Sequence, residues 1–589
     1  MSIYNIIAAS NESTVVAEYK PDNLRVYSYQ SEAELERELI DLLKTQGYEY
    51  LAIHSEKDLI QNLRRQIELL NDYKFADDEW ERFFAESIAN PNDGIVEKTR
   101  TIQDDYVKVL RRDDGSSKNI KVIDKKNIHS NRLQVINQYE EDGGHHSTRY
   151  DVSILVNGLP LVHIELKRRG VAIREAFNQI KRYQKDSFWA ASGLFEYVQI
   201  FIISNGTNTK YYSNTTRESH IKENSTSTKY KSKKTSNSFE FTSYWADCNN
   251  TVIPELMDFA KTFLAKHTIL SILTRYCVFT TENILMVMRP YQIAGAEGIL
   301  NRIKIAMNYK LAGTLNAGGY LFHTTGSGKT LVSFKTAQLA TEIPGVDLVI
   351  HVVDRRDLDY QTMKEFDRFE KGCANGNNST KVLQRQLEGK DAQGNPCKYK
   401  IIITTIQKLD RFITKNPKHD IYSKNIVFTF DECHRSQFGE MHSKITKSFK
   451  NHFLFGFTGT PIFPANAMKN SSSVLTTTQQ VFGDQLHSYT IVNAINDENV
   501  LPFRIDYVNT IIEKDNISDE NIAAIDTRKI LEAPGRISEI TKYILDNFDK
   551  QTKRNTYYDL KGRRVNGFNS MFCVDSISSN KKYYTEFKK

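Results

Sequence analysis

The stretch GGYLFHTTGSGKT, residues 318–330, decides the fold that this sequence predicts. A short apolar segment, 320–322, leads into a loop of small residues, and a helical pattern of apolar residues begins at Leu331. Glycines let backbone N–H groups approach phosphate oxygens, and the helix N-terminus adds its positive dipole end. We therefore predict a nucleotide-phosphate site in which Lys329 reaches the β- and γ-phosphates and Thr330 contacts Mg²⁺.

The loop departs from the common G-x-x-x-x-G-K-[ST] pattern at one position, because His323 stands where that pattern has its first glycine. A glycine turn without a ligand is the alternative interpretation, and the flanking strand and helix patterns argue against it. The residues that we expect to bind the nucleotide phosphates are Thr325, Gly326, Ser327, Gly328, Lys329 and Thr330.

Composition and charge are those of a large soluble protein. The chain has 589 residues, of which 40% are hydrophobic and 26% charged, with a net charge of +7 that permits a nucleic-acid partner. This length predicts three or four domains. The six cysteines form no C-x-x-C pair, which argues against a zinc ribbon or a disulfide framework. With no signal segment and no apolar run of about 18 residues, we expect a cytoplasmic protein.

Two carboxylates and a lysine stand in an apolar stretch ahead of the phosphate loop. The sequence predicts strands over 149–156 and 159–167, joined by an Asn-Gly turn. Asp151 lies near the start of the first strand, whereas Glu165 and Lys167 share one face of the second. A surface charge pair is the alternative interpretation, but a charge in an apolar strand is costly unless it has a partner.

Such a set suits phosphodiester hydrolysis. Asp151 and Glu165 would hold Mg²⁺, and Lys167 would orient or help to deprotonate the attacking water. The helix expected over 172–186 then carries Gln179 and Tyr183 four residues apart, and therefore on one face.

These residues resemble the PD-(D/E)xK nuclease family, in particular its RecB-like branch, which has a Q-x-x-x-Y helix after the catalytic strand. The resemblance implies three catalytic residues, Asp151, Glu165 and Lys167, with Gln179 and Tyr183 supporting them. The family also has an acidic residue on its first helix. The sequence predicts this helix over 29–45, and Glu38 is our choice for the acidic residue.

Apolar segments alternate with helical patterns after the phosphate loop, and each segment ends in a polar motif. The segments are 346–353, 400–404, 425–430 and 453–457. This alternation predicts a parallel, doubly wound α/β sheet, in which ligands bind at the C-terminal ends of the strands.

Asp431 and Glu432 follow the third of these segments. We expect Asp431 to hold Mg²⁺ and Glu432 to orient and deprotonate the hydrolytic water. His434 is placed to sense the γ-phosphate, and Gln292 is a candidate for adenine recognition. The candidates for gripping a DNA backbone are Arg355, Arg356, Thr404, Thr405, Gln407, Lys408, Thr458 and Thr460.

This second set resembles a superfamily 2 helicase or translocase motor, DEAD-box-like in its Asp-Glu-Cys-His sequence. A nuclease followed by such a motor resembles the R (HsdR) subunit of type I restriction enzymes. The resemblance rests on residues 149–151, 162–167, 324–330, 354–361 and 431–439. It implies ATP and Mg²⁺ as cofactors, double-stranded DNA as substrate, and a complex with modification and specificity subunits. ATP-driven translocation would precede cleavage of unmodified DNA.

The expected domains are a PD-(D/E)xK nuclease over 1–255, with a mobile polar insertion at 214–240, a helical linker over 256–285, and two RecA-like motor domains. We expect the first motor domain over 286–470 and a truncated second one over 471–589, with a helix at 537–548 and a strand at 569–574.

The second motor domain shows no Gln-x-x-Gly-Arg-x-x-Arg segment. An arginine finger contributes roughly a thousandfold or more to turnover, so we expect weak ATP hydrolysis by this chain. Two other functions stay open, a DNA-repair helicase–nuclease without a methylase partner and a non-catalytic fragment that binds DNA or ATP.

Overall fold

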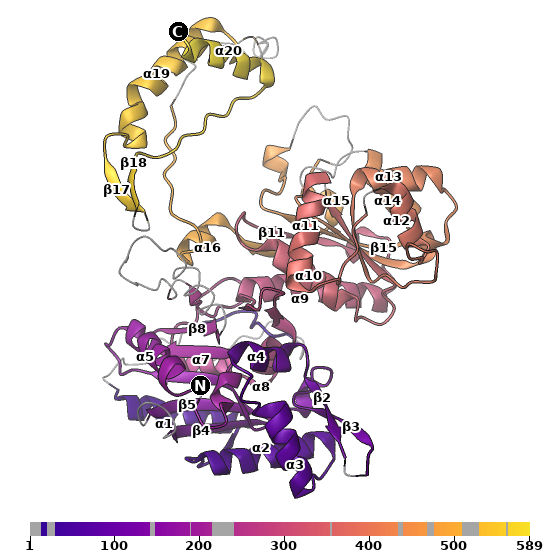
Figure 1. Ribbon diagram of the computed structural model, residues 1–589. Helices are drawn as coiled ribbons and strands as arrows, with labels where there is room; N and C mark the ends of the chain where they lie inside the picture. Colours follow the sequence, from indigo (N-terminus) through magenta and orange to yellow (C-terminus); the bar gives the residue numbers. More distant parts are fainter. Residues whose placement is uncertain are drawn as a thin grey trace. The chain divides into compact units, whose positions relative to one another are not determined.

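The computed structural model divides into a larger unit that ends at Leu501 and a smaller unit that begins at Pro502 (Figure 1). The residues that it describes are 13–20, 30–112, 114–141, 148–188, 190–214, 239, 241–353, 356–377, 379–433, 440–467, 476–508, 529, 531–560 and 563–589. The polar insertion expected at 214–240 lies almost wholly outside them.

The larger unit contains a first sheet of six strands in the order β1-β4-β5-β6-β7-β8. Its strands are β1 (Glu49–Tyr50), β4 (Leu133–Glu141), β5 (Thr148–Val156), β6 (Leu159–Leu166), β7 (Ile200–Ser204) and β8 (Thr209–Ser213). All eight residues of β6 are buried, as its apolar sequence predicts. β6 pairs antiparallel with β5 and parallel with β7, so it is a central strand of the sheet.

The tight turn between β5 and β6 depends on residues that accept left-handed backbone angles. Asn157 and Gly158 have φ angles of +51° and +85°, as an Asn-Gly hairpin requires. A Cβ at Gly158 would lie 2.6 Å from the Cα atom of Leu63. The turn is therefore packed against backbone, and only glycine fits there.

Helices surround this first sheet. They are α1 (Glu32–Thr45), α2 (Glu56–Asn71), α3 (Asp77–Phe83), the π-helix η1 (Phe84–Ile88), α4 (Ile95–Gln103) and α5 (Ile173–Asp186), with a hairpin of β2 (Val107–Arg111) and β3 (Ser117–Lys121). α1 begins at a capping box of Ser31 and Glu34 and buries Leu35, Leu39 and Leu43.

The segment expected as a helical linker is only partly helical. It contains α7 (Leu256–Phe263), α8 (Lys266–Ser271) and the π-helix η5 (Ile272–Tyr276), followed by a small hairpin of β9 (Cys277–Phe279) and β10 (Leu285–Val287). Its apolar side chains join the same hydrophobic core as those of the first sheet.

The second sheet of the larger unit is wholly parallel, in the order β13-β12-β14-β15-β11-β16. Its strands are β11 (Gly319–His323), β12 (Leu348–Val353), β13 (Ile401–Thr405), β14 (Asn425–Phe430), β15 (Asn451–Thr458) and β16 (Gln485–Tyr489). This is the doubly wound α/β sheet that the sequence predicts.

Helices α9 (Pro290–Asn308), α10 (Lys329–Ala340) and α11 (Arg356–Phe369) lie side by side along this sheet (Figure 1). The remaining helices are α12 (Thr380–Leu387), α13 (Ile406–Lys415), α14 (Glu440–Ser448), α15 (Thr478–Phe482) and α16 (Ile491–Asn496).

Strand β16 corrects the expected boundary at residue 470. It pairs in parallel with β11, so residues up to Leu501 belong to the larger unit and not to a second motor domain. The sequence Gln-Leu-His-Ser-Tyr is short and half polar, which suits a strand at a sheet edge and gives little signal of its own.

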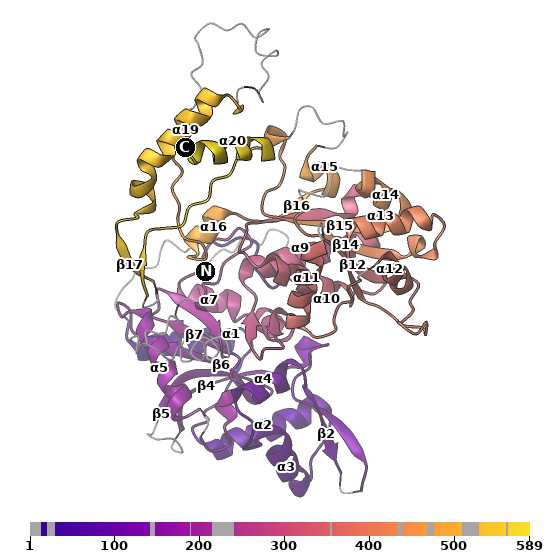
Figure 2. The ribbon, with the colours of Figure 1, turned by 45° about the horizontal axis from the view of Figure 1, so that its top comes forward.

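The smaller unit contains α19 (Pro534–Thr552) and α20 (Ile577–Phe587), which pack against each other (Figure 2), and a hairpin of β17 (Tyr557–Leu560) and β18 (Arg563–Asn566). The helix expected at 537–548 is confirmed as part of α19. The strand expected at 569–574 is wrong, because this segment is irregular and Met571 is 89% exposed. Among the described residues no strand lies beside this segment, so its backbone has no neighbouring strand with which to form β-sheet hydrogen bonds.

Candidate nuclease and nucleotide sites

Strands β5 and β6 bring Asp151 and Glu165 together. The backbone N–H of Leu166 donates a hydrogen bond to Asp151 Oδ2 at 2.9 Å, and the Glu165 side chain is fully buried. Burial raises the pKa of Glu165 to about 7, and burial together with the charge of Glu165 raises the pKa of Asp151 to about 7. Two buried carboxylates in this state are stabilised by a cation.

Lys167 lies on the same face of the chain as Glu165. Its Nζ is 3.3 Å from Glu165 Oε1 and donates a hydrogen bond to the Leu166 carbonyl at 2.8 Å. The same Nζ lies 3.8 Å from Glu32 Oε2 on α1. The structure thus assembles the predicted Asp, Glu and Lys at one edge of the sheet.

The acidic residue of the first helix that approaches this site is Glu32. The sequence-based choice, Glu38, is exposed like Glu32, but its carboxylate accepts a hydrogen bond from Gln30 Nε2 at 3.1 Å. The helical phase could have identified Glu32, because this exposed residue lies three positions before Leu35, on the helix face that buries Leu35, Leu39 and Leu43.

His163 is a site residue that the sequence reasoning missed. It is fully buried two residues before Glu165, and its Nε2 lies 3.5 Å from Glu165 Oε2. Its Nδ1 lies 3.1 Å from Ser153 Oγ, and burial lowers the pKa of its imidazole to about 4, so the ring is neutral. The period-two placement of residues 163, 165 and 167 on one face was the available signal.

A divalent cation fits this edge of the sheet. Glu165 Oε2 is buried and has no hydrogen-bond partner in the part of the chain that the structure describes. Within that part, no group of three His, Cys, Asp or Glu side chains could hold a metal ion by itself. Mg²⁺ would therefore take Asp151 and Glu165 as protein ligands and complete its oxygen shell with water or with a DNA phosphate.

Gln179 and Tyr183 are linked to β5 by hydrogen bonds. Gln179 Nε2 donates a hydrogen bond to the Tyr183 hydroxyl, which donates to the carbonyl of Arg149 at 3.1 Å. Burial raises the pKa of Tyr183, and the charge of Glu165 raises it further. The α5 pair therefore fixes the start of β5, two residues before Asp151.

The phosphate loop precedes α10, and its glycines have the backbone angles that a phosphate cradle needs. Gly326 and Gly328 have φ angles of +82° and +78°. Lys329, the first residue of α10, extends its Nζ to 3.5 Å from Glu432 Oε1 at the end of β14. The predicted phosphate-binding lysine and acidic motif thus meet.

Asp431 and Glu432 occupy the turn after β14. The N–H of Glu432, whose φ is +42°, donates a hydrogen bond to Asp431 Oδ1 at 2.9 Å. Burial and the neighbouring Glu432 charge raise the pKa of Asp431. A cation held between Asp431 and Thr330, at the start of α10, would relieve this cost. His434, expected to sense the γ-phosphate, lies outside the described residues.

Gln292, near the start of α9, contacts the phosphate loop through a hydrogen bond. Its Oε1 accepts a hydrogen bond from the Arg289 N–H at 2.9 Å, and its Nε2 donates to the Ser327 carbonyl at 2.9 Å. The Tyr291 hydroxyl donates to the same carbonyl at 2.8 Å. Gln292 thus holds the loop through its Nε2 and caps the start of α9 through its Oε1.

His323 points away from the loop in which it replaces a glycine. Its side chain is fully buried, with Nε2 3.0 Å from His487 Nδ1 on β16, and burial lowers the pKa of its imidazole well below the usual value. The departure from the common loop pattern therefore serves the packing of β11 on β16.

The strand-end residues expected to grip DNA are mostly engaged within the chain. Thr404 is fully buried and hydrogen-bonds to Asn377 Oδ1 at 2.9 Å, and Lys408 Nζ donates to the Asn377 carbonyl. Thr405 is buried and caps α13. These three shape a loop and do not present their polar atoms outward.

The other members of this set differ in exposure. Gln407 is half-buried. Thr458 is fully buried and accepts a hydrogen bond from the N–H of Thr460, which is exposed. Arg355 lies outside the described residues, as does the side chain of Arg356.

The helices in the described ranges include none that is long and apolar enough to cross a membrane.

Comparison with known proteins gives two family matches. Residues 29–220 match the model described as the N terminus of the type I restriction enzyme R protein, and residues 291–533 match the SWI2/SNF2 ATPase model. The type I restriction enzyme EcoprrI endonuclease subunit of Escherichia coli is 51% identical over 299 residues, which cover 51% of this chain and 90% of that relative.

A longer alignment is found with the type I restriction enzyme SsaAORF53P endonuclease subunit of Staphylococcus saprophyticus, which is 40% identical over 574 residues. It covers 95% of this chain and 55% of that relative, so the chain spans about half the length of such relatives. Among solved structures, a nuclease-deletion mutant of the Type ISP restriction-modification enzyme LlaGI with a DNA substrate mimic aligns over 47% of this chain and 25% of that chain, with 16% identity and a TM-score of 0.27.

Proposed function

This chain belongs to the family of type I restriction enzyme endonuclease subunits, and we propose that it contains both the DNA-cleaving and the DNA-translocating machinery of such an enzyme. The first sheet would cleave phosphodiester bonds of unmodified duplex DNA, and the second would hydrolyse ATP to move that DNA. The observation that carries the proposal is the meeting of Asp151, Glu165 and Lys167 at one edge of the first sheet.

The cleavage step follows from what these residues can do. Mg²⁺, when bound by Asp151 and Glu165, supplies a Lewis acid for the scissile phosphate. Lys167, held at 3.3 Å from Glu165, is close enough to orient the attacking water and to offset charge that develops on the phosphate. His163 is neutral and buried behind Glu165, so it positions the carboxylate and adds no charge.

The nucleotide step uses a separate set. Lys329 and the left-handed glycines, Gly326 and Gly328, would bind the β- and γ-phosphates. Asp431 and Thr330 would hold Mg²⁺, and Glu432 would orient the hydrolytic water. Gln292 keeps the loop in place through Ser327.

We further propose that the chain acts in a complex with modification and specificity subunits, and that another subunit reads the DNA sequence. Co-purification with a methyltransferase and a target-recognition subunit tests this assembly.

Plasmid cleavage tests the nuclease assignment directly. Supercoiled DNA and Mg²⁺ are incubated with the native chain, with Lys167→Ala and with Lys57→Ala, which removes an exposed lysine of α2. We expect nicked and linear products from the native and Lys57→Ala proteins and none from Lys167→Ala. Cleavage that survives in Lys167→Ala and in Glu165→Ala would refute the site.

The ATPase assignment has its own assay. Steady-state ATP hydrolysis is measured with and without duplex DNA for the native chain and for Glu432→Gln, which keeps the size of the side chain and removes its charge. Turnover that persists in Glu432→Gln would contradict the assigned role.

A further inference from the structure

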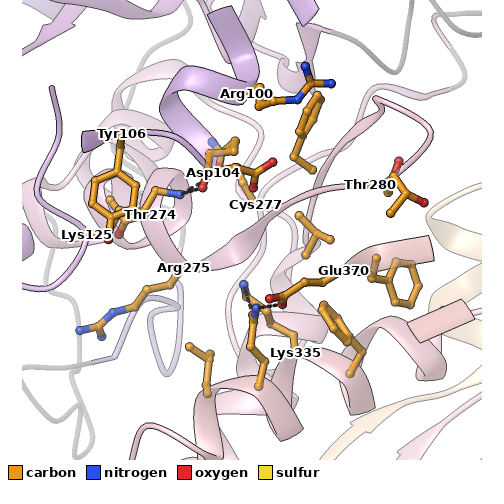
Figure 3. A pocket seen from close by; sticks show the side chains of 18 of the residues that line it. Arg100, Asp104, Tyr106, Lys125, Thr274, Arg275, Cys277, Thr280, Lys335 and Glu370 are labelled. Atoms are coloured by element: carbon orange, nitrogen blue, oxygen red, sulfur yellow. Dashed lines mark hydrogen bonds between the residues drawn. The ribbon is translucent and has the colours of Figure 1, made fainter. Parts of the chain in front are cut away.

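A cavity of about 1060 Å³ lies within the larger unit, apart from both sites described above. Its walls come from α4 and the segment that follows it, from η5 and β9, and from α10 and the end of α11 (Figure 3). No residue of the loop 324–330 lines it, and neither does any of the nuclease carboxylates.

The lining of this cavity is strongly basic. Six of the side chains are cationic, against three carboxylates, an excess of three positive charges. The cations are Arg100, Lys125, Lys126, Arg275, Lys335 and Lys371. None of the six forms an ion pair with any residue that the structure describes. A cavity with this balance attracts anions.

Two of the lysines are placed where a charge is expensive without a partner. Lys335 on α10 is 7% exposed, and its Nζ donates a hydrogen bond to Gln338 Oε1 at 2.7 Å. Lys125 lies on the opposite wall (Figure 3), and its Nζ donates to the Gln103 carbonyl at 2.5 Å and to Gln103 Oε1 at 3.3 Å. Burial lowers the pKa of each ammonium to about 8, and the charge of Lys335 adds to the effect at Lys125. An anion between them would remove this cost.

Aromatic faces accompany the cations. The Tyr106 ring centroid lies 5.5 Å from Lys125 Nζ, and that of Phe279 lies 5.8 Å from the Arg100 guanidinium carbon. Cations that bind phosphates beside flat rings that can stack on a base form the usual recognition set for a nucleotide.

We propose that this cavity binds a nucleoside polyphosphate, or an organic polyphosphate of the same charge, at a second site distinct from the phosphate loop. Arg100 and Lys125 contact the ligand from the side of the first sheet, and Lys335 contacts it from α10. Lys335 lies about 9 Å further along the helix that begins at Lys329, so one rigid element joins the two phosphate sites.

Calorimetric titration of the full chain tests this proposal. Lys329→Ala removes the main cation of the phosphate loop, and the remaining binding of ATP and of inorganic tripolyphosphate is measured in that background. We expect binding at one site with a Kd below about 1 mM for ATP. Tripolyphosphate shows whether phosphates suffice, and weaker binding of tripolyphosphate than of ATP would assign a contribution to the base.

Three additional substitutions in the same background locate the ligand. Lys335→Met keeps the apolar stem and removes a buried charge, and Arg275→Gln changes a half-buried cation on the opposite wall. We expect each to weaken ATP binding at least about tenfold. Lys381→Met, at an exposed position of α12, is the matched control and leaves the affinity unchanged.

Thermal melting followed by circular dichroism shows whether each variant is folded. We expect Lys335→Met to keep the melting temperature of its background, because the substitution removes a buried charge. Absence of ATP binding in the Lys329→Ala protein would overturn the proposal and leave a cavity filled with solvent only. So would an affinity that neither Lys335→Met nor Arg275→Gln changes. Neither result would affect the nuclease or ATPase assignments, which depend on other residues.

Discussion

Gly328→Ala should destabilise the larger unit much more than Gly326→Ala, although both residues belong to the same loop and have left-handed φ angles of +78° and +82°. Either alanine pays about 1–2 kcal/mol for that backbone conformation. At Gly326 no atom lies within 4 Å of the added Cβ, whereas at Gly328 the Cβ would lie 2.7 Å from Gln292 Nε2. The difference between the two variants therefore isolates the contact with Gln292.

The size of that difference follows from the bonds of the Gln292 amide. Its displacement would break the hydrogen bonds to the Arg289 N–H and the Ser327 carbonyl, each 2.9 Å long. A buried hydrogen bond contributes about 1 kcal/mol, so Gly328→Ala should lose about 2 kcal/mol more than Gly326→Ala. The unfolding entropy is about 2.1 cal/mol/K per residue, so for a unit that extends to Leu501 we expect the melting midpoint to be lower by about 2 °C.

The assay is thermal unfolding without nucleotide, followed by circular dichroism. A double-mutant cycle adds the decisive control, because in a Gln292→Ala background the contact is absent and Gly328→Ala should cost no more than Gly326→Ala. Equal midpoints for the two single variants, or a Gly328→Ala penalty that persists without the Gln292 side chain, would refute the role of Gln292 as the support of the loop.

Three further predictions concern the first sheet. Burial raises the pKa of Glu165 to about 7, so in EDTA the loss of stability from its buried charge is absent below its unfolded-state pKa, grows between about pH 4.5 and 7, and is complete above pH 7. Glu165→Gln should therefore raise the melting midpoint at pH 8.5 but not at pH 4. A lower midpoint for this variant at pH 8.5 would contradict the prediction. Glu32→Gln should slow plasmid nicking several-fold by changing the charge near the catalytic lysine, whereas Glu38→Gln should not, and equal rates would argue against the reassignment. Gly158→Ala should lose at least about 2 kcal/mol more stability than Gly170→Ala. The added Cβ would lie 2.6 Å from backbone at Gly158, whereas at Gly170, where φ is +88°, no atom lies within 4 Å of it. Similar melting midpoints of the two variants would disprove this contact.

The sequence predicted those elements best in which a local pattern of apolar residues ends at polar residues of a candidate site. Strands β5 and β6, the helix after them and the strands that end at Thr405 and Phe430 follow from buried apolar runs bounded by polar motifs. Asp151, Glu165 and Lys167 converge because strand alternation alone determines their faces. For these residues, local periodicity is sufficient.

The features that the sequence did not predict have a different cause, because they depend on interactions with residues distant in the sequence. β16 is a strand because β11 offers an open edge, and residues 569–574 are irregular because no described strand lies beside them. His323 takes the place of a loop glycine because His487 receives its side chain. No pattern within a short window carries this information, since the pairing of β16 with β11 and the contact of His323 with His487 join segments more than 100 residues apart.

The burial of Thr404 and Lys408 shows the same limit for function. A polar residue at a strand end can contact a ligand or can hold the loop that does so, and the sequence is identical in both cases. Here the side chains bond to Asn377 Oδ1 and to its carbonyl. Their polar atoms are already satisfied, so a DNA phosphate would have to displace an existing buried hydrogen bond, at about 1 kcal/mol or more for each group. Thr460, which follows the separate strand β15, is exposed. If this loop touches DNA, its direct contacts therefore come from exposed side chains, while Thr404 and Lys408 determine its shape.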